Sequence, residues 1–150
     1  MPDSTDWLSA AGGIVGAIGG PAGLWAAWNQ HRMNQRRRYG PPEELMGLLG
    51  KIIDVAHDIT LSYRDAAWLS ASGLSAARDR TDELSHLVTD SLLRHELGLV
   101  TANAGLVLGA VTHEHQSPER RVTTVTQQAQ YAAELDRWAK TALLGLRRRL

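Results

Sequence analysis

The feature that most constrains this chain is a run near its N-terminus, from Trp7 to Trp28, that contains no charged side chain. The run is about as long as the roughly 20 apolar residues that an α-helix needs to cross a bilayer. Trp7 stands at one end and Trp25 and Trp28 at the other, and tryptophan is typical of membrane–water interfaces. The run therefore predicts a long hydrophobic N-terminal helix that enters or spans a membrane.

Glycine is unusually frequent in the same run, which reads GGIVGAIGGPAG from residue 12 to residue 23. In a helix interior, each glycine costs about 1 kcal/mol relative to alanine. Gly12, Gly16 and Gly20 are four residues apart, so they share one helix face that a second backbone can approach closely. We infer that the glycines weaken a lone helix and favour close packing between helices, as in a homo-oligomer.

The strongly apolar aliphatic residues of the run are few: Leu8, Ile14, Val15, Ile18 and Leu24. At about −0.3 to −0.6 kcal/mol each, they contribute only roughly −2 to −3 kcal/mol to membrane insertion. The glycines and Pro21 oppose this contribution, so insertion of a single helix is marginal. The sequence leaves open whether the segment rests in lipid or packs as a glycine-rich helix inside a soluble bundle.

The flanks of the run carry opposite charge. Two aspartates precede it, and four arginines follow it: Arg32, Arg36, Arg37 and Arg38. A cleaved signal peptide has a basic start, so this acidic start argues against one. If the run spans a membrane, the positive-inside rule places the N-terminus outside and the rest of the chain in the cytoplasm. Each arginine contributes about 1 kcal/mol near an anionic leaflet, so the four are predicted to bind lipid headgroups.

Other classes of function find little support in the sequence. Acidic and basic residues balance at 16 each, and no basic domain indicates a nucleic-acid partner. The glycines lack the preceding strand that a dinucleotide-binding loop requires. His113 and His115 are two residues apart and point to different faces of a helix, so they do not predict a metal site. Because no catalytic motif appears, we expect no enzyme activity, no cofactor and no metal.

The rest of the chain is predicted to be helical throughout, and no alternating pattern predicts a strand. Pro42 in a first helical turn, and Ser117 as an N-cap before Pro118, are typical start signals. The expected fold is an all-α helical bundle. It comprises residues 41–150 and follows the hydrophobic, glycine-rich helix and its basic flank at residues 1–40.

At least three helices are expected in the bundle, at residues 42–73, about 75–111, and 118–149. Apolar or small residues at spacings of three and four predict their buried stripes. On the first helix these residues are Leu45, Leu49, Ile52, Ala56, Ile59, Tyr63 and Ala66. On the second helix they are Leu84, Leu87, Val88, Leu92 and Leu93. On the third helix they are Ala129, Ala132, Leu135, Ala139, Ala142 and Leu146. The arginines at 147–149 are expected to complement the dipole at the end of this helix.

A glycine-zipper helix, GGIVGAIGGPAG, that precedes a helical bundle resembles the HeLo-type cell-death domains of fungi and the related Bell-type domains of bacteria. The resemblance covers the architecture of the whole chain, and its one motif is the series Gly12, Gly16 and Gly20. In those families, the bundle holds the N-terminal segment until oligomerisation delivers it to the membrane, which is permeabilised. The resemblance implies a protein that is cytoplasmic at rest, responds to an upstream signalling protein and acts at the cell membrane.

Two functions from different classes are therefore expected. The first is a pore-forming or membrane-disrupting cell-death effector whose N-terminal helix inserts into anionic lipid on oligomerisation. The alternative is a helical interaction or scaffold module, anchored by a single pass in the inner membrane, without lytic activity. The residues expected to act in insertion and association are Trp7, Gly12, Ile14, Gly16, Ile18, Gly20, Trp25 and Trp28.

Overall fold

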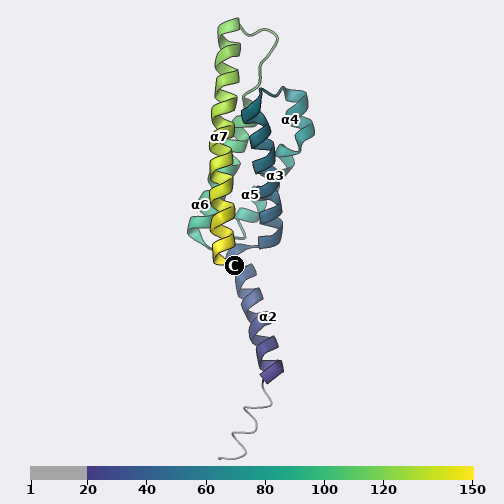
Figure 1. The fold of residues 1–150 in the computed structure, drawn as a ribbon, viewed down its shortest axis with the longest axis vertical. Coiled ribbons are helices and arrows are strands. Elements are labelled where there is room, and N and C mark those ends of the chain that lie inside the picture. Colours follow the sequence, from purple (N-terminus) through teal and green to yellow (C-terminus); the bar gives the residue numbers. More distant parts are fainter. Residues whose placement is uncertain (1–19) are drawn as a thin grey trace, which may run out of the picture. The chain divides into compact units, whose positions relative to one another are not determined.

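The computed structural model describes residues 20–150, in which all regular structure is α-helical. The helices are α2 (Gly20–Tyr39), α3 (Pro42–Leu61), α4 (Ala66–Ser72), α5 (Leu74–Ser85), α6 (Ser91–Gly109) and α7 (Pro118–Arg149) (Figure 1). The chain separates into two compact units, Met1–Gln35 and Arg36–Leu150. No strand occurs among the described residues, so the prediction of an all-α fold is confirmed for them.

The two predicted helix starts are confirmed. α3 begins at Pro42, and two glutamates lie in its first turn, where carboxylates favour the positive end of the helix dipole. α7 begins at Pro118, and the Ser117 hydroxyl accepts a hydrogen bond from the Arg120 N–H at 3.3 Å. At both starts, the proline occupies a position whose N–H would have no partner within the helix.

The prediction of one helix over residues 42–73 is wrong, because the chain leaves the helical conformation after Leu61. Ser62 is extended, with φ of −161° and ψ of 148°. Asp65 then starts α4, since its carboxylate accepts a hydrogen bond from the Trp68 N–H at 2.8 Å. An aspartate that caps a new helix in this way satisfies a backbone donor that would otherwise lack a partner.

The break also removes Tyr63 and Ala66 from the predicted buried stripe. Tyr63 is half-buried in the loop, and its hydroxyl accepts a hydrogen bond from the Thr112 N–H at 2.8 Å. Ala66 is exposed at the start of α4. Gly73 ends α4 in the left-handed conformation, with φ of 75°, so the predicted helix end at this glycine is confirmed.

The expectation of one helix over residues 75–111 is also wrong, because α5 and α6 are separate helices. Asp90 caps α6, and its carboxylate accepts a hydrogen bond from the Leu93 N–H at 2.9 Å. The interruption leaves Leu87 and Leu92, which the sequence placed in the core, 59% and 55% exposed. Two leucines therefore lie on the surface near the start of α6.

α3, α5, α6 and α7 form a four-helix bundle within the unit Arg36–Leu150. α7 packs against α3 and α6, and α5 packs against the same two helices. The largest aliphatic side chains of the core are Leu45, Leu49, Ile52, Ile59, Leu74, Leu84, Leu93, Leu97, Leu135 and Leu146, all fully buried. Their removal from water is the main favourable contribution to folding of this unit.

The buried stripe of α7 follows the prediction, except at its first position. Ala132, Leu135, Ala139, Ala142 and Leu146 are buried as expected. The stripe begins with Gln128 rather than Ala129, which is exposed. Gln128 accepts a hydrogen bond from the Arg64 N–H at 2.9 Å and donates to the Arg64 and Ala110 carbonyls at 2.8 and 2.9 Å. Because the buried amide binds three backbone groups, it joins the chain after α3 and after α6 to α7.

The bundle has two ends, which we name after one residue at each. At the Gln128 end, the C-terminal ends of α3 and α6 meet the first half of α7. At the Asp90 end, the start of α6 meets the last turn of α7, where Arg149 Nη1 lies 3.7 Å from Asp90 Oδ1. Neighbouring helices of the bundle therefore run in opposite directions (Figure 1).

Candidate functional site

The apolar and basic side chains predicted to meet a membrane are exposed where the structure describes them. On α2, Leu24, Trp25 and Trp28 are 74%, 66% and 55% exposed. The Arg32 guanidinium lies 4.8 Å from the centre of the Trp28 ring, within the range of a cation–π interaction. Trp28, predicted to belong to the apolar segment, thus contacts Arg32, predicted to bind headgroups. α2 contains no acidic residue, so its charge is entirely positive.

The other half of the predicted segment is not described. Trp7, Gly12, Ile14, Gly16 and Ile18 lie outside residues 20–150, and Gly20 is the first residue of α2. The predicted apolar helix is therefore described only from Gly20 onward. Within residues 20–150, no helix combines the length and the apolar character that a membrane crossing requires.

The last turn of α2 is fixed to the bundle at the Asp90 end. The Arg38 carbonyl accepts hydrogen bonds from the N–H groups of Thr89 and Asp90, at 3.0 and 3.2 Å. The next residue, Tyr39, is only 6% exposed and belongs to the core. Gly40 follows with φ of 67°, a left-handed conformation that turns the chain into α3. The predicted headgroup residue Arg38 therefore also takes part in a structural joint.

Asp90 lies between arginines from two distant parts of the chain. Its carboxylate is 3.8 Å from Arg38 Nη2 and 3.7 Å from Arg149 Nη1, and its side chain is 14% exposed. The sequence treated the arginines at 36–38 and at 147–149 as separate clusters with separate roles. The structure brings them to the same end of the bundle. Sequence spacing contained no sign of this proximity, because it depends on the antiparallel course of α6 and α7.

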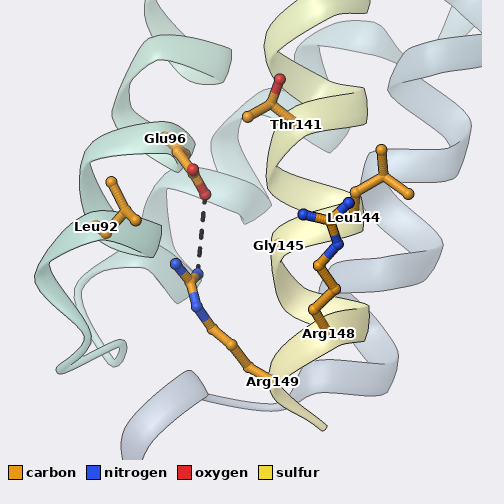
Figure 2. Close-up of a pocket in the computed structure, with 7 residues that line it drawn as sticks. All are labelled: Leu92, Glu96, Thr141, Leu144, Gly145, Arg148 and Arg149. Carbon is orange, nitrogen blue, oxygen red and sulfur yellow. Dashed lines mark ion pairs between the residues drawn. The ribbon is translucent and has the colours of Figure 1, made fainter.

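A pocket of about 330 Å³ lies beside this joint, between α6 and α7 (Figure 2). It is lined by Leu92, Glu96, Thr141, Leu144, Gly145, Arg148 and Arg149. Arg148 is exposed at its margin, as are Leu92 and Leu144. The pocket therefore combines aliphatic and cationic side chains at the surface of one bundle end.

Glu96 is the buried acid of this pocket. Glu96 Oε2 lies 3.9 Å from Arg149 Nη1, and within residues 20–150 neither atom has a hydrogen-bond partner. Burial raises the pKa of the Glu96 carboxyl, and the Asp90 charge raises it further, whereas Arg149 and His95 lower it. A Cβ on Gly145 would lie only 3.3 Å from the same carboxylate oxygen, so the absence of a side chain there gives Glu96 its space.

The described part of the chain offers no candidate metal site. His113 and His115 are exposed in the loop between α6 and α7. Within residues 20–150, no group of three or more histidine, cysteine, aspartate or glutamate side chains is placed to hold a metal ion.

The chain was compared with family models, curated proteins and solved structures. No protein-family model, no curated protein and no solved structure matches this chain. The fold and the described surface define an all-α bundle that carries an arginine-rich joint and an exposed tryptophan-containing helix.

Proposed function

We propose that this chain is a membrane-disrupting effector whose hydrophobic, glycine-rich N-terminal helix inserts into anionic lipid when several copies assemble. The observation that carries the proposal is the exposed surface of α2, where Trp25 and Trp28 precede an arginine cluster without any acidic residue. Tryptophan prefers the membrane interface, and arginine is attracted to anionic headgroups. The charge-free sequence before α2 supplies the apolar part of the proposed helix.

The proposed device has two states, one with the N-terminal segment docked and one with it inserted. The bundle holds the last turn of α2 by backbone hydrogen bonds to Arg38 and by the buried Tyr39 ring. The preceding segment has marginal hydrophobicity, so its docked and inserted states differ by only a few kcal/mol in this proposal. Clustering by an upstream signalling protein then shifts the population towards the inserted oligomer.

The alternative function is an anchored helical interaction module without lytic activity. Its supporting observation is the first part of α7, where Val122 and Val125 are exposed ahead of Gln128. An exposed aliphatic pair on a helix end suits a protein partner. In this alternative, the N-terminal helix is a permanent anchor and needs no resting position on protein.

Dye release from liposomes tests the proposal. The purified full chain is added to vesicles of phosphatidylcholine alone or mixed with phosphatidylglycerol, and we expect release from the anionic vesicles. Ile14→Asp or Ile18→Asp should abolish release, because an aspartate at the membrane centre costs roughly 3 kcal/mol. Arg36→Glu with Arg37→Glu should weaken release, because headgroup attraction becomes repulsion.

The matched control places the same new charge elsewhere. Ala129 is exposed on α7, so Ala129→Asp should leave release unchanged. Constitutive insertion of the wild type, with liposomes that remain sealed even after forced clustering, would refute the effector and support the anchored module.

A further inference from the structure

We propose that the Asp90 end of the bundle is a second lipid-binding surface, formed by the two arginine clusters together. Its members are Arg36, Arg37, Arg147 and Arg148, and we call it the arginine surface. All four side chains are exposed, and they come from the ends of α2 and α7. The inference rests on the proposed function, and it adds that the bundle itself, not only the N-terminal helix, contacts anionic lipid.

The antiparallel course of α6 and α7 explains why the clusters meet. Arg38 and Arg149 both lie within 4 Å of the Asp90 carboxylate, at 3.8 and 3.7 Å. Arg37 precedes the first of these residues, and Arg148 precedes the second. The two helix ends that carry the arginine surface therefore meet at one aspartate, although they lie more than a hundred positions apart in the sequence.

Asp90 and Glu96, two acids at the same end, pair with arginines outside the arginine surface. Asp90 is shared by Arg38 and Arg149, and Glu96 also faces Arg149. Two further acids, Glu44 and Glu83, both bind Arg80, at 2.7 and 2.6 Å.

The four arginines of the arginine surface have no acidic partner within residues 20–150. Their charges are thus available to an external polyanion.

Exposed leucines favour lipid over nucleic acid as that polyanion. Leu92 and Leu144 are 55% and 52% exposed and line the same pocket as Arg148 (Figure 2). Aliphatic side chains beside arginines suit the boundary between headgroups and acyl chains. Single-stranded nucleic acid is bound on aromatic rings, and neither the arginine surface nor the pocket contains an aromatic residue.

Co-sedimentation of the full chain with vesicles tests the inference. The vesicles contain phosphatidylcholine with or without phosphatidylglycerol, and the variant is Arg147→Gln with Arg148→Gln. Each arginine near an anionic surface is worth a factor of about five, so the double variant should bind anionic vesicles roughly thirtyfold more weakly. Wild-type binding should also weaken as salt is added, because the attraction is screened.

The same helix offers a matched control. Arg120 and Arg121 form an exposed arginine pair in the first turn of α7, at the other end of the helix. Arg120→Gln with Arg121→Gln removes the same charge and should bind like the wild type. Thermal unfolding of both double variants verifies that each is folded.

Dye release from the same vesicles separates this inference from the proposed function. If Arg147→Gln with Arg148→Gln weakens vesicle binding but the wild type releases no dye, the arginine surface is supported and the effector is refuted. If the wild type releases dye and the two double variants bind vesicles equally well, the arginine surface is refuted and the effector is supported. Absence of wild-type binding to anionic vesicles overturns both. If Arg147→Gln with Arg148→Gln loses binding to a labelled single-stranded DNA but still binds anionic vesicles like the wild type, the lipid surface is also overturned.

Discussion

Gln128 should contribute strongly to the stability of the bundle through the hydrogen bonds of its buried amide. Its amide is fully buried and binds the Arg64 N–H, the Arg64 carbonyl and the Ala110 carbonyl, at 2.8 to 2.9 Å. Gln128→Met preserves the length of the side chain but removes all three hydrogen bonds. Each such bond contributes about 1 kcal/mol net, so the substitution should lower the free energy of unfolding by about 3 kcal/mol.

The assay is chemical and thermal unfolding followed by circular dichroism. For a unit of this size, 1 kcal/mol corresponds to a change in melting temperature of about 4 °C, so we expect a decrease of about 12 °C. Gln127 is the adjacent, exposed glutamine, and Gln127→Met should change the melting temperature by less than about 2 °C. A Gln128→Met protein as stable as wild type, or an equal loss in Gln127→Met, would refute the role assigned to the buried amide.

Two further predictions concern the Asp90 end of the bundle. Burial raises the pKa of Glu96, so the folded state binds its proton more tightly than the unfolded state, and stability falls as pH rises through the interval above the ordinary glutamate value. Glu96→Gln should therefore raise the melting temperature at pH 7 but not at pH 4, and an unchanged difference between the two pH values would contradict this. Asp90→Ala removes both the helix cap and the charge between two arginines, and should cost about 1 to 2 kcal/mol in urea unfolding. Asp90→Asn keeps an acceptor for the Leu93 N–H and should cost less than half as much; equal losses would show that the cap is unimportant.

Local chemistry made parts of the fold predictable from the sequence. The starts at Pro42 and Ser117 depend on residues within one turn, and both are confirmed. Ala132, Leu135 and Ala139 recur at spacings of three and four, which places them on one helix face. They are buried, as the sequence predicted. Features that depend on a single helical turn can be predicted because no tertiary contact is needed to define them.

The sequence analysis missed two kinds of feature, local helix caps and contacts between distant residues. Asp65 and Asp90 are N-caps whose signals could have been found, since each precedes an apolar run. Gln128 could not be found by hydrophobicity, because its burial depends on backbone groups at Arg64 and Ala110.

The sequence named the residues of the candidate site but not which of them lie near one another. Trp25 and Trp28 are exposed, and their roles in insertion and association stay predictions. The joining of two arginine clusters at Asp90 required the course of α6 and α7, which no local pattern encodes.

The joint at Arg38 also gives the molecule a built-in spectroscopic reporter. The amides of Thr89 and Asp90 precede α6, and both donate to a carbonyl of the last turn of α2. Their hydrogen–deuterium exchange is slow only while that turn is attached, because an amide must leave its acceptor to exchange. Two resonances in a nitrogen–proton spectrum therefore record attachment of α2 independently of any lipid, label or cell-based readout.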